Sequence, residues 1–119
     1  MQLAGQHCLL DVSGIDIEWA KDAVRIEALL REVAHAAGAT IINSHFHTFG
    51  AGGGVTGVLL LAESHISIHT WPEHAYAALD IFMCGSHQIE LALCLLKSKM
   101  QSDFININMI NRGLPTNLN

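Results

Sequence analysis

The spacing of hydrophobic residues changes several times along this chain, and that change most constrains the fold. Residues 17–37 place apolar side chains every three or four positions, which predicts a helix with one buried face: Ile26, Leu29, Leu30, Val33 and Ala37. Gly38 is suited to end this helix because glycine tolerates the left-handed conformation. Residues 86–100 repeat the pattern, with Ser86 as the expected N-cap and a second apolar face: Ile89, Leu93, Leu96 and Met100.

Short runs with the residue pattern of β-strands occupy most of the remaining chain. The expected strands span residues 6–12, 40–49, 55–63, 66–71, 77–84 and 104–110. The run at 55–63 is continuously apolar over much of its length, which predicts burial on both of its faces. Two helices cannot cover both faces of so large a sheet. We therefore expect an α/β (α+β) two-layer sandwich, with a mostly antiparallel sheet and two helices on one face.

Length and composition limit the possible functions. A chain of 119 residues suits a single domain, 1–119, and its 50% hydrophobic and 14% charged residues favour an oligomer, which we take to be a homodimer. The net charge of −5 comes without a basic stripe, so we expect no nucleic-acid partner. We also expect no membrane partner, since no apolar run reaches spanning length. Three cysteines and no secretory signal predict a cytoplasmic protein.

Residues whose side chains can take part in catalysis are concentrated between positions 63 and 85. Residues 63–73 read Glu-Ser-His-Ile-Ser-Ile-His-Thr-Trp-Pro-Glu, and residues 77–85 read Ala-Ala-Leu-Asp-Ile-Phe-Met-Cys-Gly. Ser64 lies at the junction of two strands and not in a Gly-x-Ser-x-Gly elbow, which argues against a serine hydrolase. Two histidine pairs share strand faces, at positions 45 and 47 and at 65 and 69. Eight histidines make chance pairs common, and we expect no metal site.

These two segments, with Gly-Gln-His at residues 5–7, resemble the prokaryotic S-adenosylmethionine decarboxylase proenzyme family over most of the chain. The resemblance implies a self-processing, pyruvoyl-dependent decarboxylase that supplies the aminopropyl donor for polyamine (spermidine) synthesis. It further implies cleavage between Glu63 and Ser64, after the Ser64 hydroxyl attacks the Glu63 carbonyl. The products would be a β chain, 1–63, and an α chain, 64–119, that begins with a covalent pyruvoyl group made from Ser64. This cofactor would bind substrate as a Schiff base and accept electrons as carbon dioxide leaves.

The resemblance also assigns roles to individual residues. Cys84 would donate the proton to the product, His69 would be the base in self-processing, and Thr56 would supply a processing hydroxyl. Glu73 would bind the ribose hydroxyls of the substrate and Phe49 would stack on its adenine. The active sites would lie at the dimer interface, with Ser64 and Cys84 from one chain and Thr56, His69 and Glu73 from the other.

Each of these residue types also has an ordinary structural explanation. An isolated Cys84 would be a small hydrophobic core residue, and His69 a core histidine with satisfied hydrogen bonds. Thr56 and Phe49 are common strand residues. We expect Cys8 and Cys94 to be structural, with Cys94 on the apolar side of the second helix.

Several positions depart from the family pattern and leave the substrate open. Thr56 stands where serine is usual, Met83 replaces a usual threonine, and the glycine-rich loop at residues 50–54 is one residue longer than usual. His74 and Ala75 stand where tyrosine and glycine are common. Arginine or ornithine is an alternative substrate, whose distal cation would meet one of three carboxylates: Asp11, Glu73 or Asp80. An inactive regulatory partner subunit is a further alternative, but it would have no need for Glu63, Ser64, His69 and Cys84 together.

Overall fold

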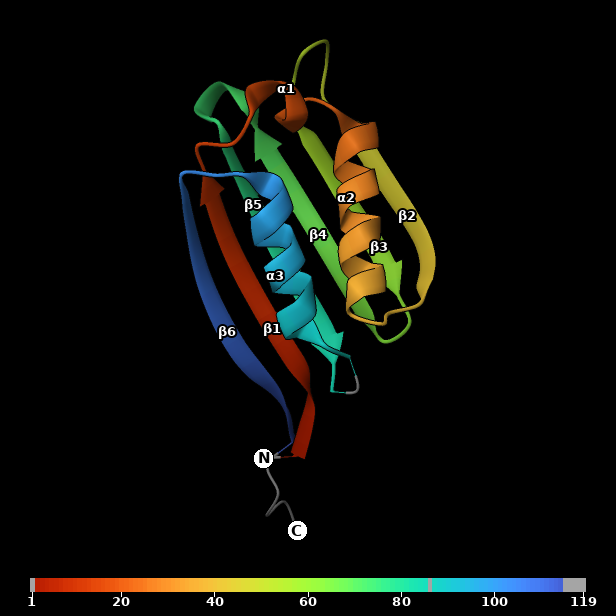
Figure 1. Cartoon of the computed structure of the whole chain (residues 1–119). Helices are drawn as coiled ribbons and strands as arrows, with labels where there is room; N and C mark the ends of the chain where they lie inside the picture. The colour runs from red at the N-terminus through yellow and green to blue at the C-terminus, as the bar shows by residue number, and fades with distance from the viewer. Residues whose placement is uncertain (1, 86, 115–119) are drawn as a thin grey trace.

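One six-stranded sheet forms the larger layer of the molecule, in a computed structural model that describes residues 2–85 and 87–114 (Figure 1). The strands lie in the order β2-β3-β4-β5-β1-β6, and every neighbouring pair is antiparallel. Their bounds are β1 (Gln2–Ser13), β2 (Ile41–Thr48), β3 (Val55–Leu61), β4 (Ser64–Trp71), β5 (Tyr76–Cys84) and β6 (Phe104–Leu114). The sheet is thus more strictly antiparallel than the sequence predicts.

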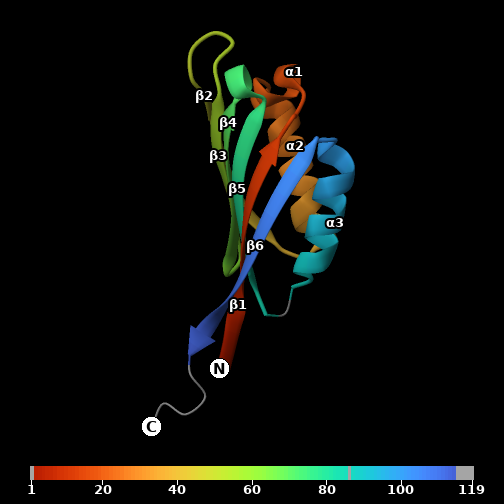
Figure 2. The same cartoon turned by 90° about the vertical axis from the view of Figure 1, so that its left-hand side faces the viewer.

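The helices lie together on one side of this sheet (Figure 2). They are α1 (Ile17–Ala20), α2 (Ala23–Ala36) and α3 (Ile89–Met100), and a short 3₁₀ helix, η1 (Pro72–His74), joins β4 to β5. No helix within residues 2–85 and 87–114 combines the length and hydrophobicity needed to cross a lipid bilayer.

The single helix expected over residues 17–37 is wrong, because the chain forms two helices there. Asp16 caps α1 by accepting a hydrogen bond from the Glu18 amide at 3.0 Å, and Asp22 caps α2 through the Arg25 amide at 3.1 Å. Each carboxylate accepts a hydrogen bond from a backbone amide that has no partner inside its helix. This favours the start of a second helix at Asp22. The helix ends as predicted, with Gly38 in the left-handed conformation at a φ of 80°. The N-cap of α3 is Gln88, and the expected cap Ser86 lies outside the described residues.

The core lies between the helices and the inner face of the sheet. The predicted apolar face of α2 is buried, and so are all four predicted apolar residues of α3. Cys94 is exposed on α3, so its expected place on the apolar side is wrong. The expectation that residues 55–63 are buried on both faces is also wrong for the single chain, because Leu60 is 46% exposed.

The sheet face opposite the helices, which we call the open face, carries the alternate side chains of each strand. On β4 these are His65, Ser67, His69 and Trp71, while the residues between them are buried toward the helices. The open face includes several exposed apolar side chains: Leu9, Leu60, Trp71 and Ile110. Apolar side chains gathered on one face favour contact with another surface.

Candidate active site

The predicted cleavage site lies in the tight turn between β3 and β4. Leu61 and Ser64 are paired across these strands, so Ala62 and Glu63 form a two-residue turn. Glu63 has a φ of 59°, in the left-handed region. For a residue with a side chain this conformation costs about 1 kcal/mol. The bond between Glu63 and Ser64 therefore follows a strained residue.

Ser64 and Cys84 meet at the neighbouring ends of β4 and β5. Ser64 is the first residue of β4 and only 9% exposed, and Cys84 is the last residue of β5. The Cys84 backbone N–H donates to the Ser64 hydroxyl oxygen at 3.1 Å. The structure thus brings together the two residues that the sequence assigns to one chain of the site.

His87 is a further residue at this end of the sheet, and it lies outside the residues predicted from the sequence. Its Nδ1 lies 3.4 Å from the Sγ of Cys84. Its backbone N–H also donates to the Cys84 carbonyl at 3.0 Å, which fixes the turn after β5. A histidine three residues beyond Cys84, just past Gly85, is the sequence signal that would have found it.

Thr56 and His69 form a second group at the other end of the β3–β4 pair. They are directly opposite in the strand register, and Thr56 Oγ1 lies 3.0 Å from His69 Nδ1. Together with Phe49 and Glu73 they line a pocket of about 320 Å³. The predicted substrate-binding residues and the predicted processing pair therefore share one pocket.

This pocket and the Ser64 end of the hairpin are far apart within one chain. Ser64 and His69 lie five positions apart on β4, and a strand advances about 3.3 Å per residue, which gives roughly 17 Å. They also face opposite sides of the sheet, because odd spacing along a strand reverses the side-chain direction. The structure does not bring His69 to Ser64 of the same chain.

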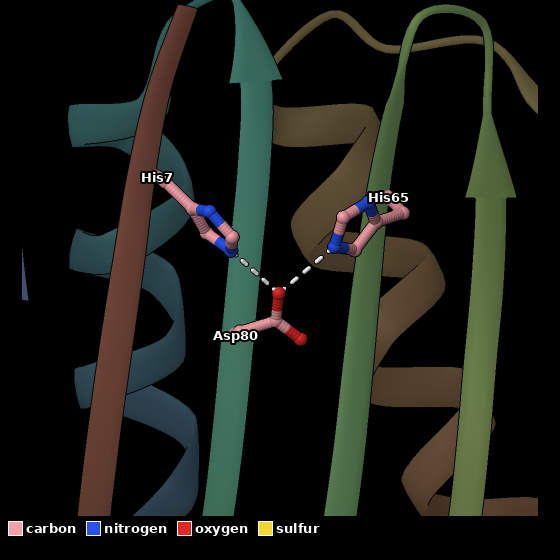
Figure 3. Close-up of side chains that lie close together, drawn as sticks. All are labelled: His7, His65 and Asp80. Atoms are coloured by element: carbon pink, nitrogen blue, oxygen red, sulfur yellow. Dashed lines mark hydrogen bonds and ion pairs between the residues drawn. The ribbon is translucent and has the colours of Figure 1, made fainter. Parts of the chain in front are cut away.

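A polar cluster on the open face connects β1, β4 and β5 (Figure 3). Asp80 Oδ2 lies 2.7 Å from His7 Nε2 and 2.8 Å from His65 Nε2, and Asp80 also accepts a hydrogen bond from the Ser67 hydroxyl. Burial alone would raise the pKa of Asp80, but the hydrogen bonds from Ser67, His7 and His65 outweigh it and lower that pKa. Asp80 therefore carries a charge that is already satisfied by its neighbours.

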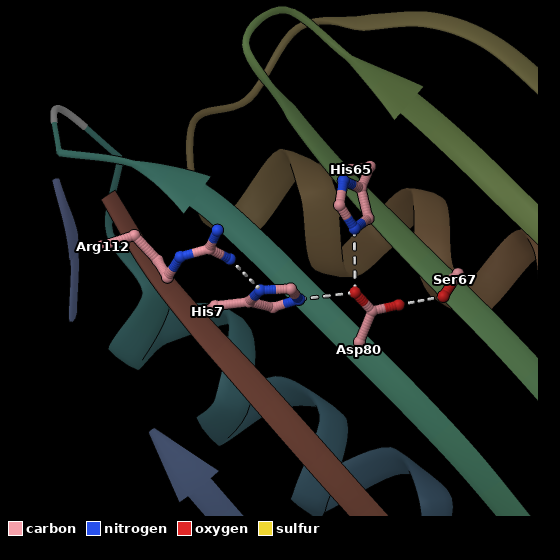
Figure 4. A network of polar contacts seen from close by, with 5 residues as sticks. All are labelled: His7, His65, Ser67, Asp80 and Arg112. Atoms are coloured by element: carbon pink, nitrogen blue, oxygen red, sulfur yellow. Dashed lines mark hydrogen bonds and ion pairs between the residues drawn. The ribbon is translucent and has the colours of Figure 1, made fainter. Parts of the chain in front are cut away.

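Two histidines and one carboxylate are also a familiar set of metal ligands, and these three ligand atoms lie within 4.8 Å of one another. Arg112 argues against that use, because its Nη1 lies 3.1 Å from His7 Nδ1 (Figure 4). A guanidinium only donates, so His7 Nδ1 accepts and the proton lies on Nε2, facing Asp80. A metal-binding Nε2 would instead need its other ring nitrogen to donate. The cluster fits a hydrogen-bonded network better than a metal centre.

The carboxylates considered as partners for a cationic substrate differ in their availability. Asp80 is engaged by three side chains, and Asp11 accepts a hydrogen bond from the Tyr76 hydroxyl. Asp11 and Asp80 line a separate pocket of about 340 Å³, whereas Glu73 is exposed and lines the pocket that contains Phe49 and Thr56. Of the three, Glu73 is placed best to meet a ligand.

Comparison with known proteins gives a consistent set of similarities. A sequence model described as S-adenosylmethionine decarboxylase matches residues 6–113. The S-adenosylmethionine decarboxylase proenzyme of Methanococcus vannielii is 41% identical over 115 residues, which cover 96% of this chain and 93% of the relative. The proenzyme of Parasynechococcus marenigrum strain WH8102 is 40% identical over 114 residues, covering 95% and 88%. The crystal structure of the adenosylmethionine decarboxylase from Aquifex aeolicus VF5 matches with a TM-score of 0.88 at 34% identity, covering 98% and 97%.

Proposed function

This chain belongs to the S-adenosylmethionine decarboxylase family, and from that membership we propose that it is a self-processing, pyruvoyl-dependent decarboxylase of S-adenosylmethionine. The observation that carries the proposal is the turn between β3 and β4. There a strained Glu63 precedes a serine whose hydroxyl is held by the Cys84 amide. The decarboxylated product would serve polyamine synthesis as an aminopropyl donor.

Processing would begin at the Ser64 hydroxyl. Its oxygen attacks the carbonyl carbon of Glu63, and the acyl group moves from the Ser64 nitrogen to the oxygen. The Cys84 N–H, 3.1 Å from that oxygen, limits its rotation, and the left-handed Glu63 raises the energy of the intact turn. The elimination that follows needs a base: it releases the Glu63 carboxylate and leaves a dehydroalanine, whose imine form takes up water and loses ammonia to give the pyruvoyl group. We propose His69 for this role, oriented by Thr56 at 3.0 Å.

A pyruvoyl group made from Ser64 would supply the carbonyl electron sink that decarboxylation requires. The residues around Ser64 fit this group, because the precursor hydroxyl is held beside Cys84 at the end of β4. Cys84 would deliver a proton from its Sγ to the product Cα. Phe49 is 56% exposed, which suits stacking on adenine, and Glu73 offers its carboxylate to the ribose hydroxyls.

We further propose a homodimer with shared active sites. The roughly 17 Å between Ser64 and His69 on one strand is too long for proton transfer within one chain. A second copy packed on the open face would cover its apolar side chains and bring the partner's His69 close to the β3–β4 turn, where the backbone bond between Glu63 and Ser64 lies. Each site would then combine Ser64 and Cys84 with the partner's Thr56, His69 and Glu73.

The proposed function is tested by intact mass and by carbon dioxide release. Wild type should yield two fragments, of which the α chain has a blocked N-terminus, whereas Ser64→Ala should remain one chain. Ser98→Ala, at an exposed serine of α3, is the matched control and should process normally. Purified protein should release carbon dioxide from S-adenosylmethionine and not from arginine or ornithine. A full-length wild type after prolonged incubation would refute self-processing, and release only from a basic amino acid would refute the substrate.

A further inference from the structure

The contact between Cys84 and His87 connects the proposed proton donor to an imidazole. The Cys84 Sγ lies 3.4 Å from His87 Nδ1, within hydrogen-bond distance for sulfur. Two backbone bonds hold this turn in place: His87 N–H donates to the Cys84 carbonyl at 3.0 Å, and Gln88 N–H donates to the Ala37 carbonyl at 3.1 Å. The imidazole is therefore fixed beside the sulfur by the end of β5 and the end of α2.

Decarboxylation would require Cys84 to be reprotonated after each turnover. When carbon dioxide leaves a carboxylate, its electron pair stays on Cα, and replacement by hydrogen consumes one proton in each turnover. If Cys84 gives that proton from Sγ, the sulfur becomes a thiolate. A second turnover requires a proton from solvent to reach the same sulfur.

We propose that His87 is a positioning residue that returns this proton to Cys84, an inference that rests on the proposed function. The protonated imidazole gives the hydrogen on Nδ1 to the thiolate Sγ and becomes neutral. The neutral ring then takes a proton from water, which restores both groups. His87 acts only through Cys84 and makes no contact with substrate in this scheme.

The surroundings of His87 suit a relay to solvent. Its side chain is half-buried, and the nearby Gly85 and Gln88 are exposed, so a ring whose Nδ1 contacts the sulfur lies close to solvent. The other thiols are placed differently. Burial raises the pKa of Cys8 to about 11, and Cys94 is exposed on α3.

The test uses the full chain and His87→Asn. Asparagine can still hydrogen bond to sulfur, but its amide does not titrate. The first readout is alkylation by iodoacetamide, followed by peptide mass analysis that separates the Cys84 peptide from the Cys94 peptide. Cys94 serves as an internal reference for reagent exposure. Alkylation reports the share of Cys84 that is present as thiolate, which a neighbouring proton acceptor raises, and it requires no turnover.

We expect His87→Asn to lower the Cys84 to Cys94 alkylation ratio about tenfold, because the thiolate is the reacting form and a neighbouring imidazole favours it. Processing into two fragments should persist. Carbon dioxide release should fall about tenfold or more and recover in part when imidazole is added. The matched control is His35→Asn, at an exposed histidine of α2, which should leave the alkylation ratio and the turnover rate at wild-type values.

An unchanged alkylation ratio in His87→Asn would overturn the proposal. If turnover is slower but added imidazole does not restore it, and the alkylation ratio is unchanged, the proposal is equally overturned. His87 would then be a packing residue. If wild type neither processes nor releases carbon dioxide, the proposed function fails. The alkylation ratio alone then decides whether His87 exchanges a proton with Cys84.

Discussion

Asp80 shows how single residues tie this sheet together. It lies on β5 and accepts hydrogen bonds from His7 on β1 and from His65 and Ser67 on β4. We expect Asp80→Asn to lower the free energy of unfolding by about 2 kcal/mol at neutral pH, since hydrogen bonds to a charged group are worth roughly that much. Urea unfolding of both proteins measures the difference.

The pH dependence of this effect follows from the lowered pKa of Asp80. Burial opposes the charge, but the bonds from Ser67, His7 and His65 prevail. A carboxyl whose pKa is lower in the folded state stabilises the protein at pH values above its unfolded-state pKa. This stability is lost as the pH falls through the folded-state pKa. The gap between wild type and Asp80→Asn should therefore shrink in acid. Glu32→Gln, at an exposed site on α2, should show no comparable gap, and a gap that grows in acid would contradict the assignment.

The roles proposed for Cys84 allow processing and turnover to be tested separately. Its backbone N–H holds the Ser64 hydroxyl, while its thiol is assigned to the product proton. Cys84→Ala retains the backbone group, so we expect normal cleavage into two fragments but carbon dioxide release about a hundredfold slower. Intact mass and a release assay measure the two steps. Cys94→Ala should retain both activities, and full turnover in Cys84→Ala would remove the thiol from the mechanism.

Thr70 connects α1 to the sheet. Its buried hydroxyl donates to the Ala20 carbonyl at 2.7 Å and accepts from the Val55 N–H at 2.8 Å. Thr70→Val has nearly the same shape but leaves both backbone groups without this partner. We expect a loss of about 2 kcal/mol in unfolding free energy, because a buried unsatisfied polar group costs roughly 1–3 kcal/mol. Chemical denaturation measures this loss.

The conservative variant tests whether the hydroxyl is responsible. Thr70→Ser retains both hydrogen bonds and loses only a methyl group, so its loss should be clearly smaller than that of Thr70→Val. A loss in Thr70→Ser as large as that in Thr70→Val would contradict the assignment, because the serine retains the hydroxyl.

The helices and strands were predictable to the extent that burial follows hydrophobic spacing. The faces of α2 and α3 were confirmed because their apolar residues recur at helical intervals. The break before Ala23 was missed although Asp16 and Asp22 are both typical cap residues. Hydrophobic periodicity indicates which side of a helix is buried. It does not indicate where one helix ends and the backbone hydrogen bonding of the next begins. Cys94 was misplaced because its hydrophobic character was taken as a sign of burial.

Contacts among the candidate site residues were predictable where a sequence motif names the residues, and not where the contacts depend on strand register. Ser64 and Cys84 lie twenty residues apart, and the motif named both before the Cys84 amide was seen on the Ser64 hydroxyl. The cluster around Asp80 depends on pairings between β1, β4 and β5, which no local pattern encodes. The contact between His87 and Cys84 was not predictable, because it depends on how the chain turns after β5.

The two groups of proposed site residues occupy opposite ends of one hairpin. Ser64 lies beside the turn at one end of β4, and His69 lies with Thr56 and Glu73 near the other. The open face between them carries exposed Leu9, Leu60 and other apolar side chains. The proposed two-fold dimer would cover this face and would join the separated groups at two equivalent sites.

This arrangement predicts complementation between two defective chains. Ser64→Ala cannot process, and His69→Ala should process poorly, so each homodimer should be nearly inactive. In a mixed dimer one site collects both lesions, while the other combines an intact Ser64 with the partner's intact His69. Random pairing makes about half of the dimers mixed, each with one working site, which gives roughly a quarter of wild-type activity. The two chains are unfolded, mixed and refolded, and carbon dioxide release is measured.

A second pair of variants makes the test specific for shared sites. Ser64 and Cys84 are assigned to the same chain of each site, so Ser64→Ala mixed with Cys84→Ala should restore nothing: every site in that mixed dimer retains one lesion. Recovery in the first mixture and none in the second would distinguish exchange of half-sites from general stabilisation by mixing. Recovery in neither, with mixed dimers demonstrated by mass, would contradict shared sites, and a monomer in solution would exclude them. Because β4 itself separates Ser64 from His69, a single chain that retains this sheet would not bring the proposed base to the proposed cleavage site.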